Sequence, residues 1–170
     1  MAAVSLIIDE KVEREMADKF VEFFNAVPPQ EEKVIYFSTV GGDLKYRDII
    51  IDLINRNSEN LTLVAVDYIA SAGFTIFIEA KCKKELTDLT QGMFHMSKSE
   101  VYLDENYSVS SSRYESKLFS KHIDTLKSKS LKTINELQFT KKERKRALAG
   151  KDVVFSYERM LEFIANDKTQ

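Results

Sequence analysis

The chain has 170 residues, of which 44% are hydrophobic and 31% are charged, a composition typical of one globular domain with a sizeable core. The net charge of −2 makes nucleic acid and membrane surfaces unexpected partners. A single cysteine, Cys82, excludes an internal disulfide and a multi-cysteine zinc site, and no cofactor or metal is expected. With no run near the roughly 20 apolar residues of a membrane span and no signal-peptide pattern, a cytoplasmic protein is expected.

Strand and helix patterns alternate through the first half of the chain. Apolar, partly β-branched runs predict strands over 4–8, 33–40 and 61–70, with further strand material in 85–97. Amphipathic or apolar spacing predicts helices over 10–27 (with Asp9 as N-cap), 44–56 and 72–80. Near-continuous apolar strands separated by helices predict an α/β fold with a mostly parallel sheet, covered on both faces.

The second half of the chain is more helical. The serine-rich segment 98–112 is predicted to be a loop or an extended arm. Helices are predicted over 112–137, 140–148 and 156–165. The basic cluster 141–146 contains a glutamate and is interpreted as a solvated helix face rather than a phosphate-binding patch. We predict one domain, 1–170, in which a helical arm of roughly 98–140 follows the last predicted strand.

Two junctions between a strand and a helix carry the small residues that an active site needs. Gly41 and Gly42 follow one strand, where backbone N–H groups are open to close approach, although no phosphate-binding motif surrounds them and a tight turn is the simpler interpretation. Ser71 follows another strand, where the first N–H groups of a helix, beginning with Ala72, could stabilise an oxyanion. Helix–sheet packing alone would also select small residues there.

A serine nucleophile needs a nearby base, and the chain has two histidines. His95 ends an apolar stretch, whereas His122 falls among charged residues in the long predicted helix. Parallel strands bring their carboxyl ends to one edge of the sheet, where ligands bind in open α/β folds. Gly41–Gly42, Ser71 and His95 all follow or end strands, so the three signals indicate the same edge.

The order of these motifs resembles the ClpP family of the ClpP/crotonase fold. That family carries P-G-G, A-A-S-M-G-A and I-H-Q where this chain reads 39-TVGGD-43, 69-IASAGF-74 and 94-FHM-96. The resemblance covers most of the chain and implies a mostly parallel sheet built from repeated ββα-type units flanked by helices. The long helix after 112 resembles the family's handle.

The resemblance implies peptide-bond hydrolysis through an acyl-enzyme, with Ser71 as nucleophile and His95 as general base and then acid. The backbone N–H groups of Gly42 and Ala72, with Gly41 adjacent, would form the oxyanion hole. Peptides or unfolded proteins would be the substrates. A catalytically silent assembly or adaptor protein and a crotonase-type acyl-CoA enzyme are the alternatives, although crotonases usually rely on carboxylates.

The family's third catalytic residue precedes a D-x-x-[LF]-[ST]-x-x-E-A frame, which 152-DVVFSYERMLEF-163 fits. The resemblance therefore implies that Asp152 orients His95, and Asp124 and Glu143 are the alternatives. Several departures, among them an N-terminus without the family's axial loop, make an ATPase partner less expected than in ClpP itself. A homo-oligomeric ring is the assembly that the resemblance implies.

Overall fold

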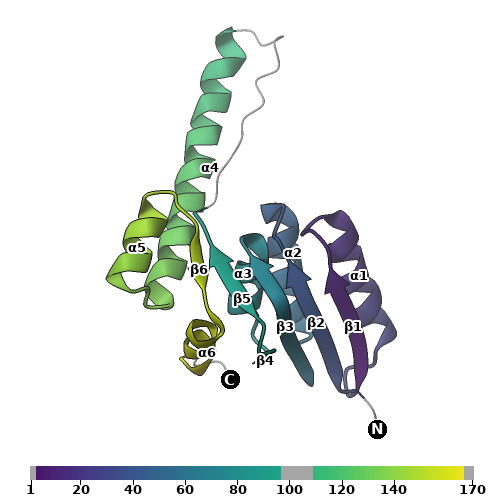
Figure 1. Cartoon of the computed structure of the whole chain (residues 1–170). Coiled ribbons are helices and arrows are strands. Elements are labelled where there is room, and N and C mark those ends of the chain that lie inside the picture. The colour runs from purple at the N-terminus through teal and green to yellow at the C-terminus, as the bar shows by residue number, and fades with distance from the viewer. Residues whose placement is uncertain (1–2, 97–108, 167–170) are drawn as a thin grey trace. The chain divides into compact units, whose positions relative to one another are not determined.

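A computed structural model describes residues 3–96 and 109–166 of the chain (Figure 1). Most of the segment predicted to be a loop or arm, 97–108, lies outside the described residues. The fold divides into two compact units, Met1–Phe94 with Val153–Gln170, and His95–Asp152. The single domain with a helical arm over roughly 98–140 remains a prediction.

The first unit contains a six-stranded sheet with helices between its strands. Its strands and helices are, in chain order, β1 (Val4–Asp9), α1 (Arg14–Ala26), β2 (Lys33–Thr39), α2 (Leu44–Arg56), β3 (Leu61–Ala70), α3 (Ala72–Glu79), β4 (Lys83–Leu86), β5 (Gln91–Phe94), β6 (Val153–Phe155) and α6 (Tyr157–Ala165). The sheet order is β1-β2-β3-β5-β6, with β4 also paired to β3. Only β5 and β6 pair antiparallel, which confirms the predicted mostly parallel α/β fold.

The start of α1 differs from the prediction. Asp9 ends β1 and is not an N-cap; the helix begins at Arg14, four residues later than expected. The intervening residue Val12 forms a parallel bridge with Gly42. Its N–H donates to the Gly41 carbonyl (3.0 Å), and its carbonyl accepts from the N–H of Asp43 (2.7 Å). Extended pairing with a distant turn therefore replaces the first helical turn that local spacing favoured.

Strand β3 changes partners along its length. Its first part pairs with β4, in the register Thr62↔Lys83 to Ala65↔Leu86, and its last part pairs with β5, in the register Tyr68↔Gln91 to Ala70↔Met93. Between these stretches Asp67 has a positive φ of 61°, a conformation that few non-glycine residues adopt. The last residues of β3 lie beside β5, and Ser71 follows them directly in the chain.

An aromatic cluster fixes the β5–β6 side of the sheet. The ring of Phe74 on α3 lies 6.1 Å from Phe94, 5.2 Å from Phe155 and 6.1 Å from Phe163, measured between centroids. Phe94 and Phe155 belong to β5 and β6, and all four side chains are buried. The short strand β6, which local sequence patterns did not predict, is held by this packing.

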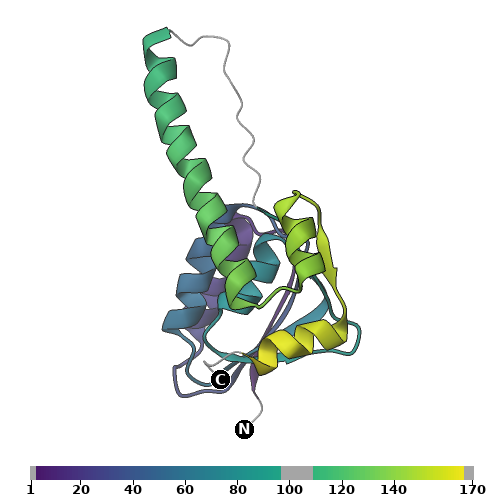
Figure 2. The same cartoon turned by 90° about the vertical axis from the view of Figure 1, so that its left-hand side faces the viewer.

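Helix α1, helix α2 and helix α3 lie on the same face of the sheet (Figures 1 and 2). On the opposite face two neighbouring side chains in register, Ile7 of β1 and Tyr36 of β2, are 73% and 41% exposed. The prediction that helices cover both faces was therefore wrong for this part of the sheet. Along β2, buried positions alternate with partly or fully exposed ones, so the strand packs on the core with one side only.

The second unit contains α4 (Val109–Glu136) and α5 (Lys141–Leu148), close to the predicted 112–137 and 140–148. Thr140 caps α5 in a capping box: its hydroxyl accepts from the N–H of Glu143 (3.2 Å), whose carboxylate accepts from the N–H of Thr140 (2.6 Å). Among the described residues, no helix is both long enough and apolar enough to cross a membrane.

Loss of this cap should be measurable. We expect Thr140→Ala to lower the free energy of unfolding by about 1 kcal/mol, because the N–H of Glu143 loses its acceptor. Thr125→Ala is the matched control: the Thr125 hydroxyl bonds back to the Lys121 carbonyl at an exposed position of α4, where alanine is the better helix former. Urea denaturation of both variants tests the expectation, and equal stabilities would contradict it.

Candidate functional site

Ser71 occupies the sharp turn between β3 and α3. Its backbone angles, φ 54° and ψ −118°, belong to a region that non-glycine residues rarely enter. The turn is held on both sides: the Ser71 N–H donates to the Met93 carbonyl of β5 (2.9 Å), and its carbonyl accepts from the N–H of Thr75 (3.2 Å). A serine on a strained strand-to-helix turn is the arrangement that presents a nucleophile in many hydrolases.

The Gly41–Gly42 turn lies directly against the Ser71 turn. A Cβ atom added to Gly41 would lie 2.7 Å from the Ser71 Cβ, 2.7 Å from the Ala70 carbonyl oxygen and 3.1 Å from the Ala72 nitrogen. Gly41 also has a φ of +95°. Its N–H donates to the hydroxyl of buried Thr39 (3.1 Å). Glycine is therefore required at position 41 because any side chain would separate the two turns.

Backbone N–H groups lie on both turns, at Gly42 and Ala72. Ala72 is the first residue of α3, so its N–H has no acceptor within the helix and lies at the positive end of the helix dipole. Gly42 follows Gly41 at the bridge with Val12, and it is exposed whereas Gly41 is buried. The residues predicted from the sequence as oxyanion donors thus flank the tight Gly41–Ser71 contact.

In the second unit, His95 and Asp152 form a pair. The His95 Nδ1 lies 3.3 Å from the Asp152 Oδ1, and the two side chains are 27% and 59% exposed. A carboxylate at Nδ1 favours the tautomer with the proton on that nitrogen, which leaves Nε2 as the acceptor. The pair therefore places a carboxylate beside one ring nitrogen of His95.

The other acids considered from the sequence occupy different environments. The carboxylate of Glu143 belongs to the capping box of α5, bonded to the N–H of Thr140. Asp124 is an exposed residue of α4. The side chain of His122 lies outside the described residues. Asp152 is therefore the carboxylate that the structure places at His95.

The two units are joined by the chain where β5 ends and where β6 begins. His95 directly follows Phe94 and Asp152 directly precedes Val153, and Phe94 and Val153 are opposite each other in the β5–β6 ladder. The nucleophile turn and the glycine turn lie in the first unit, and the His95–Asp152 pair lies in the second. The structure thus brings together Gly41 with Ser71 and Ala72, and separately His95 with Asp152.

Two residues that contact the site residues, Arg146 and Thr39, were not identified from the sequence. Arg146 on α5 donates from its guanidinium to the Asp152 carbonyl oxygen. The Thr39 hydroxyl accepts from the Gly41 N–H, and an added Cβ at Gly73 would lie 2.1 Å from the Thr39 Cγ2. The run of small residues in 69-IASAGF-74 is a signal for close packing at Gly73, whereas nothing local indicates the role of Arg146.

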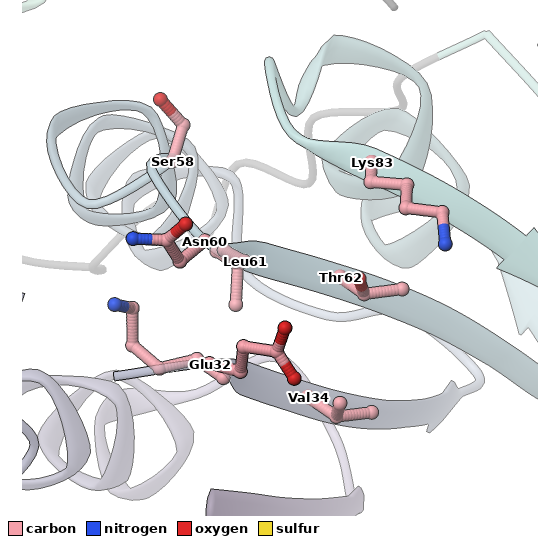
Figure 3. A pocket seen from close by; sticks show the side chains of 8 residues that line it. Glu32, Val34, Ser58, Asn60, Leu61, Thr62 and Lys83 are labelled. Carbon is pink, nitrogen blue, oxygen red and sulfur yellow. The ribbon is translucent and has the colours of Figure 1, made fainter. Parts of the chain in front are cut away.

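A separate polar pocket of about 370 Å³ opens near the beginnings of β2 and β3 (Figure 3). Lys33 lies in its wall, its ammonium donating to the carbonyls of Pro29 and Glu31 (both 2.9 Å). Its other lining side chains include Lys83, whose pKa is raised by its hydrogen bond to Glu85. Because parallel strands end at the opposite edge, this pocket is distinct from the Ser71 turn. No group of three or more metal-ligating side chains occurs among the described residues.

Comparison with known proteins supports the fold. The chain is similar to the structure of an asparagine-to-aspartate mutant of ClpP1 from Listeria monocytogenes, with a TM-score of 0.69 and 18% sequence identity, over 94% of this chain and 86% of that one. The chain therefore has a ClpP-like fold. No protein-family model matches the sequence, and no curated protein matches it either.

Proposed function

We propose that the protein is a serine peptidase with a ClpP-like fold, in which Ser71, His95 and Asp152 form the catalytic triad. The observation that carries the proposal is the backbone of Ser71: a non-glycine residue held at φ 54° and ψ −118° where a strand becomes a helix. Strain of this kind costs about 1–3 kcal/mol and concentrates at functional sites. The His95–Asp152 contact and the ClpP-like fold give independent support.

In this mechanism the Ser71 Oγ attacks the carbonyl carbon of a peptide bond while the His95 Nε2 accepts its proton. The Asp152 carboxylate accepts the hydrogen bond of the Nδ1–H group and stabilises the imidazolium. The N–H groups of Gly42 and Ala72 stabilise the oxyanion. The imidazolium then protonates the leaving amine, and water, activated by His95, hydrolyses the acyl-enzyme and regenerates Ser71.

The test is covalent labelling by a fluorophosphonate probe. We expect the wild-type protein to be labelled and both Ser71→Ala and His95→Gln to lose labelling, because the first removes the nucleophile and the second its base. Ser38→Ala is the matched control: this serine lies on β2, and its hydroxyl bonds to the Tyr68 carbonyl (3.3 Å). Labelling that persists in Ser71→Ala would show that another residue reacts with the probe and would exclude Ser71 as the nucleophile. No labelling of the wild type in any assembly state would favour a catalytically silent assembly protein.

We further propose that the chain forms a homo-oligomer through the face of β1 and β2 that lies opposite α1, α2 and α3. Ile7 and Tyr36 are adjacent, apolar or aromatic, and exposed there, as expected of residues that a second copy covers. We expect Tyr36→Glu to lower the mass measured by light scattering after size exclusion. Leu89→Glu is the control, since Leu89 is 78% exposed but lies outside the strands. An unchanged mass in Tyr36→Glu would exclude this face.

A further inference from the structure

Helix α5 ends in a backbone motif that sets the position of Asp152. Gly150 has a φ of +68°, and the N–H of Lys151 donates to the Arg146 carbonyl (3.0 Å) while the N–H of Gly150 donates to the Ala147 carbonyl (2.9 Å). These two bonds form a Schellman motif, which reverses the chain through a left-handed residue. Asp152 is the second residue after that glycine, so the motif sets the direction in which its backbone leaves the helix.

The side chain of Arg146 holds the same loop at its far end. Its Nε and Nη2 donate to the Asp152 carbonyl oxygen at 3.2 and 3.0 Å. Two N–H donors from one rigid guanidinium thus share that oxygen, and the charge of the donor strengthens the contact. Because the Arg146 carbonyl also accepts from Lys151, one residue contacts two consecutive residues, Lys151 and Asp152, of the short connection that follows Gly150.

The Asp152 carboxylate needs this support because packing does not supply it. Its side chain is 59% exposed, whereas an orienting carboxylate in a buried site is held by its neighbours. Its contact with the His95 Nδ1 is 3.3 Å, beyond the usual distance for a charge-assisted hydrogen bond, so a small backbone displacement would break it. The position of the backbone therefore decides whether the pair forms.

We propose that Arg146 and Gly150 are positioning residues that hold Asp152 at His95. The proposal rests on the proposed function for its catalytic consequence, but the pairing itself is a property of the second unit. With Asp152 in place, His95 carries its proton on Nδ1 and offers Nε2 as the base. Without the Arg146 contact the loop moves, the carboxylate leaves Nδ1, and the ordinary preference of imidazole for the other tautomer returns.

The test combines nitrogen NMR of ¹⁵N-histidine-labelled protein with the rate of fluorophosphonate labelling. We expect Arg146→Met to shift the His95 nitrogen signals toward the Nε2–H tautomer and to slow labelling by about 10- to 100-fold, the range for a misplaced catalytic group. Arg146→Lys should restore part of both signals, since it returns a charged donor without the fork. His122→Gln assigns the spectrum, because the chain has two histidines.

Arg144→Met is the matched control. Arg144 lies on the same helix, and its guanidinium bonds to the Asn135 side chain (2.7 Å) and not to the Asp152 loop. We expect both readouts to remain at wild-type values in this variant. Unchanged tautomer signals in Arg146→Met would overturn the proposal, as would an equal effect of Arg144→Met.

A backbone variant covers the case in which Arg146→Met fails to fold. No atom lies within 4 Å of a Cβ added at Gly150, so a substitution there tests its φ alone. We expect Gly150→Val to reproduce the loss of the Nδ1–H signal, and Gly150→Asn, which tolerates positive φ, to retain it. If only the proposed function fails, the wild-type protein will not be labelled, but its His95 tautomer will still depend on Arg146 and Gly150.

Discussion

Gly73→Ala is expected to destabilise the fold by about 2–3 kcal/mol, even though alanine is the better helix former, because an overpacked contact outweighs helix propensity. The added Cβ would lie 2.1 Å from the Thr39 Cγ2, so the start of α3 must move away from the end of β2. The same movement separates Ser71 from the Gly41 turn. Urea denaturation should show the loss of stability, and fluorophosphonate labelling should fall with it.

The contact can be relieved without losing the hydrogen bond beside it. Thr39→Ser removes Cγ2 but keeps the hydroxyl that accepts from the Gly41 N–H (3.1 Å). The other atoms near a Cβ at Gly73 are 3.5 and 3.6 Å away, which is ordinary contact. We therefore expect the double variant to regain most of the lost stability, with a coupling energy of about 1–3 kcal/mol. Additive effects in the double-mutant cycle would contradict the packing explanation.

Peptide hydrolysis is expected to fall by a factor on the order of 10⁶ in both Ser71→Ala and Ser71→Gly, because neither retains a nucleophile. Their stabilities should differ. Alanine keeps the strain of a Cβ at φ 54°, whereas glycine adopts this conformation freely. We expect Ser71→Gly to be more stable than Ser71→Ala by about 1–2 kcal/mol, despite the greater entropy of glycine in the unfolded chain.

Thr75→Ala and Thr75→Gly provide the comparison for a relaxed helical position. Thr75 lies inside α3, where glycine should be the less stable of the two by about 1 kcal/mol. Hydrolysis of fluorogenic casein measures activity, and chemical denaturation measures stability. If glycine is the less stable residue at position 71 as well, the backbone there is not strained and the observation that carries the proposed function is lost.

Local sequence signals were sufficient for much of the first unit. Helix α2 begins and ends where its amphipathic spacing predicted, since the side chain of Asp43 caps it by accepting from the N–H of Lys45 (2.6 Å). Strand β3 likewise matches the predicted 61–70. The predicted start of α1 was wrong because Val12 pairs with Gly42, thirty residues further along the chain. No local sequence pattern indicates such a partner.

For the candidate site, the sequence provided residue types and their order. Small residues around Ser71 and at Gly41–Gly42 were visible as motifs, His95 was indicated by its place at the end of an apolar stretch, and the resemblance to ClpP indicated Asp152. The positive φ of Ser71 could not be read from its neighbours, because serine does not prefer that conformation; the hydrogen bond to Met93 and the packing of Gly41 impose it.

By itself the sequence determined the fold class. Strands and helices that pack on a core need apolar side chains at their own characteristic spacing, and this spacing can be read from neighbouring residues. The tertiary structure alone decided which carboxylate meets His95. Asp152 is 57 positions further along the chain, and it reaches the ring through an antiparallel strand pair, a left-handed glycine and an arginine contact. Each of these depends on groups distant in sequence, whose meeting only the folded chain determines.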